Sequence, residues 1–266
     1  MTSQASQHEQ RERLTTASPV KLWASGLVAS ATAGRVIGAL TRHRIRHQGI
    51  WFDTRSADFS PRVRAQMFWG GYEGAETRMI RSILRASPTV VELGSSLGIT
   101  TAHIAAVMAH GGRLVCVEAN PRLIPGLSER VALLSGQQRV DVIHAAITGH
   151  CGTTELIIAG ETVGSRIGSP RPDEPIVQVP AMTLREILRR ANIAEFDLVS
   201  DIEGAEAAFL LGDPDALGNC RRAVIEFHDT VAEGRTVSAF DLIDAAVATG
   251  LQVISRHGPV VAFSRA

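Results

Sequence analysis

His228, Asp201 and Glu203 are the side chains of this 266-residue sequence that are best suited to proton transfer. Imidazole titrates near neutral pH, so His228 is the first candidate for a general base that takes a proton from a hydroxyl group. Asp201 is the second candidate, and Glu203 would face the same cleft. Asp201 with Asp229 or Glu226 offers an alternative, because paired carboxylates can hold magnesium, which acidifies a bound hydroxyl. The sequence shows no tight carboxylate cluster, and we therefore expect catalysis without a metal.

A glycine-containing segment follows the first apolar run and reads Val-Val-Glu-Leu-Gly-Ser-Ser-Leu-Gly from Val90. Gly94 and Gly98 would allow a sharp turn and a close approach of the backbone to a ligand. Their spacing differs from the G-x-G-x-x-G of nicotinamide enzymes. Glu92 would repel a pyrophosphate, whereas it would favour the ammonium and sulfonium groups of S-adenosylmethionine. The segment therefore predicts an S-adenosylmethionine site that includes Ser95.

A second acid, Glu118, ends the next apolar run, 24 residues after Gly94. In nucleoside-binding α/β folds, an acid at this place accepts hydrogen bonds from the ribose hydroxyls. We assign Glu118 and the following Ala119 to the same cofactor site. The glycine motif alone has low specificity, but its combination with an acid at the next strand end predicts a nucleoside cofactor.

Strands alternate with helices along residues 85–266, which we expect to form the catalytic domain. Buried strands are predicted at 89–93, 113–118, 140–144, 196–200 and 222–227. Helices are predicted between and after them, at 99–109, 121–134, 183–191, 203–211 and 235–249. This alternation predicts an α/β fold with a mostly parallel sheet, and a final hairpin at 251–255 and 259–263 adds an antiparallel edge strand. Asp201 and His228 would then lie side by side at one sheet edge, and Glu206 would stabilise a helix N-terminus.

A loop rich in glycine, serine and proline, residues 160–175, separates two further expected strands at 154–159 and 176–179. Long loops of this kind usually carry function, so we expect it to act as a lid over the acceptor.

The chain before residue 85 has a different composition. Residues 1–19 are polar and are expected to form a mobile tail. Residues 20–84 form an N-terminal extension that is expected to be helical over 20–47 and is rich in aromatic residues thereafter. The apolar part of that helix carries an arginine and three glycines, which is too weak a pattern for a membrane span, so we expect a cytoplasmic protein. The basic run at 42–46 would suit a peripheral contact with an anionic membrane, although we favour a helix that covers the catalytic domain.

Composition excludes several classes of protein. The chain has 27 basic and 27 acidic residues, so its formal net charge is zero. Because nucleic-acid binding ordinarily needs a basic field, we expect no nucleic-acid partner. Three scattered cysteines without a C-x-x-C pair argue against a disulfide framework and a zinc site. Composition leaves both a monomer and a homodimer open.

These motifs resemble those of the FkbM-type methyltransferases, a branch of the class I S-adenosylmethionine-dependent enzymes. The resemblance covers residues 70–264, and its further matching segments are Ala145–Ile147, Met182–Leu188 and Asp197–Glu206. The last segment is the most specific and is similar to the family signature lysine-isoleucine-aspartate-valine-glutamate-glycine-alanine-glutamate. Ser200 stands where that signature has lysine, and Glu92 stands where aspartate is commoner.

The resemblance implies a Rossmann-like class I sheet, S-adenosylmethionine as cofactor, and methylation of a hydroxyl group on a sugar, glycolipid or secondary metabolite. In the resembling enzymes the region before the first strand leads into the cofactor site, so Tyr72 and Glu73 are expected to wall it. Two alternatives stay open. The glycine spacing disfavours a nicotinamide-dependent oxidoreductase, and the intact glycines and acids disfavour a non-catalytic Rossmann-like binding module.

Overall fold

The computed structural model describes residues 30–134, 137–158, 164–168, 170–232 and 234–265. The chain divides into two compact units, Met1–Tyr72 and Glu73–Ala266. We expected the boundary at residues 84 and 85, after helix α5 (Gly74–Ile83). The division comes earlier because α5 buries Met79 and Ile80 in the core of the second unit. The predicted tail at 1–19 lies outside the described residues.

The described part of the N-terminal unit contains two helices and a hairpin: α3 (Ala31–Leu40), β1 (Arg44–His47), β2 (Ile50–Asp53) and α4 (Pro61–Phe68). The prediction of a helix as far as residue 47 is therefore wrong after Leu40. The period in β1 is two, because Ile45 and His47 are buried while Arg44 and Arg46 are exposed. Gln48 and Gly49 both have positive φ, as a two-residue hairpin turn requires.

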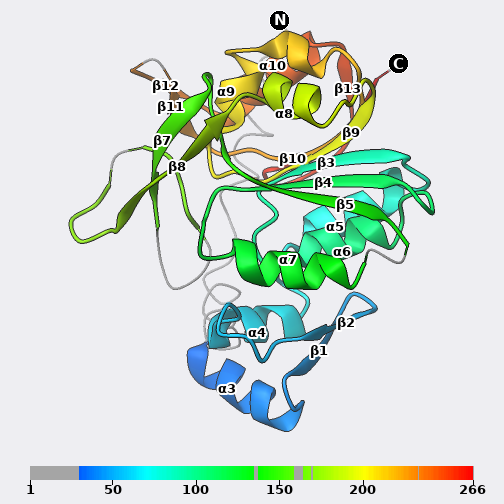
Figure 1. The fold of residues 1–266 in the computed structure, drawn as a ribbon, viewed down its shortest axis with the longest axis vertical. Helices are drawn as coiled ribbons and strands as arrows, with labels where there is room; N and C mark the ends of the chain where they lie inside the picture. Colours follow the sequence, from blue (N-terminus) through cyan, green and yellow to red (C-terminus); the bar gives the residue numbers. More distant parts are fainter. Residues whose placement is uncertain (1–29, 135–136, 159–163, 169, 233, 266) are drawn as a thin grey trace, which may run out of the picture. The chain divides into compact units, whose positions relative to one another are not determined.

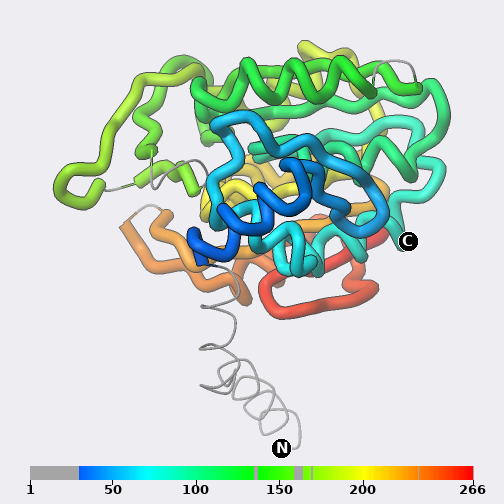
Figure 2. The backbone as a smooth tube through the Cα atoms, turned by 90° about the horizontal axis from the view of Figure 1, so that it is seen from below, coloured from blue at the N-terminus to red at the C-terminus, as the bar shows by residue number. Residues whose placement is uncertain are grey.

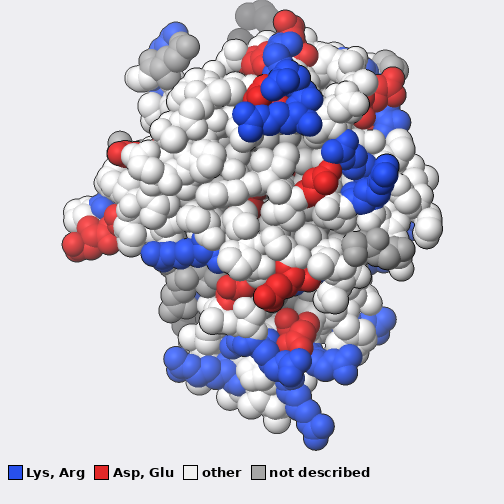
Figure 3. Space-filling model, viewed as in Figure 1, with Lys and Arg blue, Asp and Glu red and all other residues white. Residues whose placement is uncertain are grey.

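The surface of the N-terminal unit is rich in arginine (Figure 3). The exposed arginines of its described part are Arg35, Arg42, Arg44, Arg46, Arg55 and Arg62. Trp51 on β2 is 60% exposed, and its ring lies beside the guanidinium of Arg44. Among the described helices of the chain, none has the length and apolarity that a membrane span needs.

The second unit is built on a seven-stranded sheet in the order β13-β14-β10-β9-β3-β4-β5. The strands are β3 (Thr89–Leu93), β4 (Arg113–Glu118), β5 (Arg139–His144), β9 (Phe196–Ser200), β10 (Cys220–Glu226), β13 (Leu251–His257) and β14 (Val260–Arg265). Strands β10, β9, β3, β4 and β5 pair in parallel, whereas β14 pairs antiparallel with both β10 and β13. This confirms the predicted α/β fold with a mostly parallel sheet and a terminal antiparallel hairpin.

Helices cover both faces of this sheet (Figure 1). One face carries α5, α6 (Ile99–Ala105) and α7 (Ile124–Ala132), and the other carries α8 (Leu184–Arg190), α9 (Glu206–Leu210) and α10 (Ala239–Ala248), with a 3₁₀ turn at Pro214–Leu217. Side chains alternate between two separate cores, because successive strand residues point to opposite faces. Val90 and Val199 pack on the α5–α7 side, while Val91 and Leu198 pack on the α8–α10 side.

Two smaller β elements follow the carboxyl ends of the parallel strands. After β5 comes a three-stranded sheet of β6 (Ala146–Ile147), β8 (Ile176–Met182) and β7 (Gly152–Ile157). After β10 comes a hairpin of β11 (Thr230–Ala232) and β12 (Arg235–Val237). Figures 1 and 2 show both elements on the same side of the central sheet. The helix predicted from 235 therefore begins only at Ala239, where Ser238 caps it by accepting a hydrogen bond from the Asp241 N–H at 3.2 Å.

Candidate active site

The glycine turn after β3 is held tightly against the end of β9. Gly94 has φ +85°, and a Cβ at this position would lie 1.9 Å from the carbonyl oxygen of Asp201. The Gly94 N–H donates a hydrogen bond to the Val117 carbonyl at 2.9 Å. Gly98, which also has positive φ, precedes α6. Only glycine suits Gly94, because both its φ and its contact with Asp201 exclude a side chain.

Glu118 lies at the end of β4 beside this turn and is 6% exposed. Its two carboxylate oxygens accept hydrogen bonds from the Ser96 and Asn120 N–H groups, each at 2.7 Å. Burial raises the pKa of Glu118, and the backbone donors oppose this shift. A carboxylate has about four acceptor positions, so Glu118 can still accept donors such as ribose hydroxyls. The structure places Glu118 where the sequence predicted, and the assignment of Ala119 stays a prediction.

Glu92 faces inward at the turn and is 1% exposed. Its Oε2 accepts hydrogen bonds from the hydroxyls of Ser95, at 2.9 Å, and Thr101, at 2.7 Å. Burial raises the pKa of Glu92 to about 7. In the described structure, Glu92 and Ser95 therefore stabilise the glycine turn through hydrogen bonds. Their contact with a cofactor stays a prediction.

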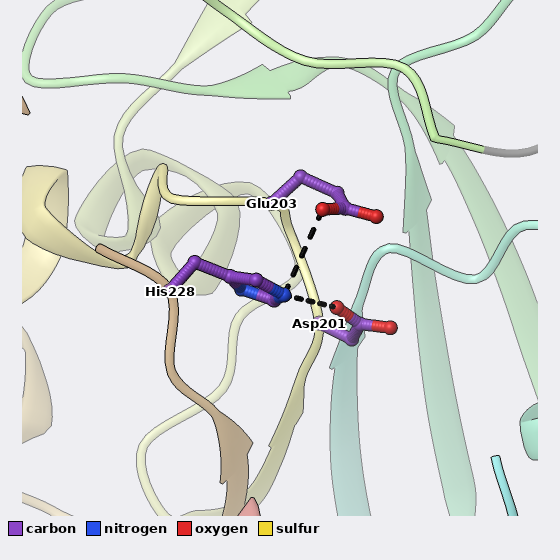
Figure 4. A group of neighbouring side chains, drawn as sticks. All are labelled: Asp201, Glu203 and His228. Carbon is purple, nitrogen blue, oxygen red and sulfur yellow. Dashed lines mark ion pairs between the residues drawn. The ribbon is translucent and has the colours of Figure 1, made fainter. Parts of the chain in front are cut away.

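His228 follows β10, and its ring points towards Asp201 and Glu203, which follow β9 (Figure 4). Its Nε2 is 3.6 Å from Glu203 Oε2 and 4.0 Å from both Asp201 Oδ1 and Glu226 Oε1. Strands β9 and β10 are adjacent and parallel, as the sequence predicted, and this pairing brings the two strand ends together. The His228 side chain is 27% exposed, so a bound molecule can reach it.

Glu206 is fully buried behind His228. Its Oε1 lies 3.6 Å from Nδ1 of His228 and accepts a hydrogen bond from the Ile202 N–H at 3.1 Å. The sequence assigned Glu206 only to the stabilisation of a helix N-terminus. The structure shows that it also lies against the imidazole. Its charge and its distance from Nδ1 suit it to hold His228 so that Nε2 faces the other carboxylates.

This arrangement keeps a proton on His228. Burial alone would lower the pKa of His228, but the carboxylates of Glu206, Asp201 and Glu203 outweigh burial and raise it to about 9. Burial raises the pKa of Asp201 well above its ordinary range, and the charges of Glu226 and Glu73 add to this shift. The groups therefore share protons as one coupled set, in which an imidazolium is stable at neutral pH.

A second group of acids meets the first at Asp201. Carboxylate oxygens of Glu73, Glu76 and Asp201 lie within 4.8 Å of one another, as do the polar atoms of Asp201, Glu203 and His228. The sequence had predicted Glu73 but missed Glu76. The signal was present, because Glu76 occupies a position in the apolar stripe of α5 that continues with Met79 and Ile80. The two groups show a tight carboxylate cluster that the sequence did not reveal, and metal-free catalysis stays a prediction.

Other predicted residues lie elsewhere. The Oδ1 of Asp229 accepts a hydrogen bond from the Ala239 N–H at the start of α10, at 2.8 Å. Asp229 belongs to neither of the two groups of possible metal ligands found among the described residues, and the magnesium pair of Asp201 with Asp229 stays a prediction. Tyr72 is the last residue of the N-terminal unit, and its role stays a prediction. In the predicted lid, residues 160–163 and 169 lie outside the described residues, but Ser165 accepts a hydrogen bond from the Asn120 side chain at 3.0 Å.

A family model described as the methyltransferase FkbM domain matches residues 92–249. No curated protein sequence matches the chain. Among solved structures, an FkbM methyltransferase from Methylobacillus flagellatus is 15% identical, with a TM-score of 0.46, over 87% of this chain and 58% of that chain. Fibrillarin from Aeropyrum pernix, with natively bound S-adenosyl-L-methionine, is 13% identical, with a TM-score of 0.43, over 71% and 72% of the two chains.

Proposed function

Because the chain belongs to the FkbM methyltransferase family, we propose that it transfers the methyl group of S-adenosylmethionine to a hydroxyl group of a sugar, a glycolipid or a secondary metabolite. One observation carries the proposal. The family match contains both the Glu118 strand end and the His228 carboxylate group, and the fold brings the glycine turn into contact with Asp201 between them. The acid that we assign to the nucleoside and the side chain that we assign as proton acceptor thus lie at one sheet edge.

The residues present fit S-adenosylmethionine better than a dinucleotide. Glu118 retains acceptor capacity for two ribose hydroxyls. The acids around Asp201 would repel the phosphates of a nicotinamide cofactor, whereas they would favour a ligand that carries positive charge. This supports a methyltransferase over the oxidoreductase alternative.

The protein's own contribution to methyl transfer would be to orient the acceptor and to remove its proton. S-adenosylmethionine supplies the electrophilic methyl group when it is bound. His228 Nε2 would accept the hydroxyl proton of the acceptor as the oxygen attacks, and Glu206 would steady the ring from Nδ1. His228 must lose its own proton first. Because its pKa is about 9, kcat/KM should rise with pH towards that value.

Calorimetric titration and a methyl-transfer screen test the proposal. The full chain should bind S-adenosylmethionine and S-adenosylhomocysteine but not NAD, and Glu118→Ala should weaken both by about 1–3 kcal/mol, the usual cost of unpaired hydroxyls. A screen with methyl-labelled cofactor should then label hydroxylated acceptors, with sugars and glycolipids tested beside phenols and amines. Binding of NAD, or transfer only to nitrogen, would contradict the proposal.

A further inference from the structure

We propose that the outer face of the β1–β2 hairpin and the adjoining end of α3 bind the surface of an anionic phospholipid membrane and insert two side chains into it. The hairpin face carries Arg44, Arg46 and Trp51, and the end of α3 carries Leu40. These four residues are named here the hairpin surface. They belong to the N-terminal unit alone, so the membrane contact does not depend on the proposed methyl transfer.

The strand register places the basic and the aromatic side chains on one face of the hairpin. Arg46 pairs directly with Trp51, and Arg44 lies two residues earlier in β1, so the three side chains project to the same side. The alternating residues Ile45 and Phe52 are buried on the other side. The guanidinium carbon of Arg44 lies 5.9 Å from the centre of the Trp51 ring. The outer face is therefore an exposed indole flanked by two guanidinium groups.

The N-terminal unit carries a concentrated positive charge (Figure 3). Residues 30–72 contain seven arginines, two aspartates and neither lysine nor glutamate, a net charge of +5, whereas residues 73–266 carry a net charge of −6. Asp53 is bound by Arg55, at 2.9 and 3.0 Å. Within the described ranges, the three arginines of residues 42–46 form no ion pair with an acid. Their charge is thus available to lipid phosphates, which a membrane presents at high density.

Leu40 supplies the apolar part of the surface. It is the last residue of α3 and is 81% exposed, and Val36, one turn earlier on the same helix face, is also exposed. The chain then turns sharply into β1, because Arg42 and His43 both have positive φ and the His43 N–H donates to the Gly38 carbonyl at 2.7 Å. An exposed leucine next to arginines and an indole suits a membrane interface, where acyl chains, head groups and phosphates are layered.

Single-stranded nucleic acid is the other polyanion that an indole flanked by arginines could bind, since a base can stack on the ring while the arginines contact phosphates. The exposed aliphatic side chains of Val36 and Leu40 favour the membrane. Transfer into acyl chains stabilises an aliphatic side chain in proportion to the area removed from water. Neither base stacking nor a phosphate contact offers it a comparable gain.

Co-sedimentation of the full chain with lipid vesicles tests the proposal. One set of vesicles contains phosphatidylglycerol and phosphatidylcholine in equal parts, and the other contains phosphatidylcholine alone. Each test variant removes one part of the hairpin surface: Leu40→Ala, Trp51→Ala, and the double variant Arg44→Gln with Arg46→Gln. Circular dichroism confirms that every variant is folded, which exposed positions should allow.

The second unit offers matched controls. Leu133 at the end of α7 is 86% exposed and resembles Leu40 in type, exposure and place on its helix, so Leu133→Ala is the control for Leu40→Ala. Arg85 and Arg139 are exposed arginines of the same unit, and their joint replacement by glutamine removes the same charge as the double variant.

We expect the wild type to bind the anionic vesicles and not the neutral ones, and salt should weaken this binding. The double arginine variant should bind about 25-fold more weakly, because each arginine near an anionic surface contributes about fivefold. Leu40→Ala and Trp51→Ala should each weaken binding by about 10-fold, the order expected for burial of one large apolar side chain. Both controls should stay within about twofold. Brominated acyl chains should quench the fluorescence of the wild type more than that of Trp51→Phe.

Several results would overturn the proposal. A wild-type protein that does not bind anionic vesicles would refute it directly. Binding that all three test variants leave unchanged would place the membrane contact elsewhere in the chain. Loss in the arginine variant alone, without quenching at Trp51, would show adsorption by charge without insertion. Binding of a labelled single-stranded RNA that Trp51→Ala abolishes and Leu40→Ala does not change, without vesicle binding, would make the hairpin surface a nucleic-acid site.

Discussion

Replacing Glu206 with glutamine should lower the pKa of His228, because the buried carboxylate lies 3.6 Å from Nδ1. With an effective dielectric constant of about 20, one charge at this distance contributes about 5 kcal/mol, and one pKa unit corresponds to about 1.4 kcal/mol. Three further carboxylates share the interaction, and the imidazole is partly exposed. We therefore expect the pKa of His228 to fall from about 9 by about 1 to 2, and not by the full electrostatic amount.

The assay is an NMR titration of the imidazole C–H resonances between about pH 5 and 11, with the His228 signal assigned by its loss in His228→Asn. The pH profile of kcat/KM should shift to lower pH by the same amount as the titration. Glu186→Gln is the control. Glu186 is an acid on α8 whose partners are exposed arginines, and its replacement should leave both readouts unchanged.

The same substitution has a consequence for stability. The pKa of His228 in the folded protein lies above its ordinary value of 6.5, so the imidazolium stabilises the fold below about pH 6.5. That contribution is lost as the pH rises through about 9. Glu206→Gln should reduce the loss over this range. An unchanged titration of His228 in a folded Glu206→Gln protein would refute the electrostatic argument.

Three further predictions concern other parts of the molecule. Burial raises the pKa of Glu92 from 4.5 to about 7, so the protonated carboxyl stabilises the fold at low pH, and this stabilisation is lost as the pH rises between these values. The free energy of unfolding in urea of Glu92→Gln should therefore increase relative to that of the wild type by up to about 3 kcal/mol from pH 5 to pH 8. A difference that does not change with pH would contradict this. His228→Ala should lower the methyl-transfer rate by about 10²–10⁴-fold, with near-normal cofactor affinity. EDTA should not change the methyl-transfer rate of the wild type. A loss of activity in EDTA that magnesium restores would instead establish the metal route. The full chain should sediment with vesicles that contain anionic phospholipid and not with neutral ones, and Arg44→Glu with Arg46→Glu should release it; sedimentation unaffected by these changes would remove the β1 surface from membrane contact.

The sheet could be predicted closely from the sequence. Strands β3, β4 and β9 begin and end at the predicted residues. Each is a mostly apolar run, because both of its faces are covered by helices, and such runs are limited by the polar or glycine residues at their ends. The predictions were less accurate at hairpins outside the central sheet. β1 carries arginine at alternate positions, and β12 has only three residues, so neither has enough apolar periodicity to be distinguished from a helix.

The acids of the site also differ in whether the sequence could predict them. Glu118 and Asp201 were predictable because Glu118 ends β4 and Asp201 directly follows β9, and the carboxyl ends of parallel strands meet at one edge. Glu76 and Glu206 were not, because their importance arises from packing between elements distant in sequence. Glu76 comes from α5, whereas its partner Asp201 follows β9. Glu206 looks like an ordinary first-turn acid until β10 places His228 against it.

Asp201 belongs both to the group of Glu73, Glu76 and Asp201 and to the carboxylates around His228, and this sharing leads to the last prediction. If the positively charged cofactor binds beside the first group, its charge would compete with His228 for Asp201, so the imidazolium would lose part of its stabilisation and its pKa would fall. Binding of S-adenosylmethionine near pH 8 should therefore release protons. Calorimetric titrations in buffers with different ionisation enthalpies measure the number of protons released, as the slope of the observed binding enthalpy against the ionisation enthalpy of the buffer. Glu76 and Asp201, whose pKa values burial raises, would also lose protons on binding. The comparison is therefore with His228→Asn, which should release fewer protons than wild type by up to about one per site. Equal slopes for the two proteins would show that cofactor binding and the protonation of His228 are independent, and the base would then be activated only by an increase in pH.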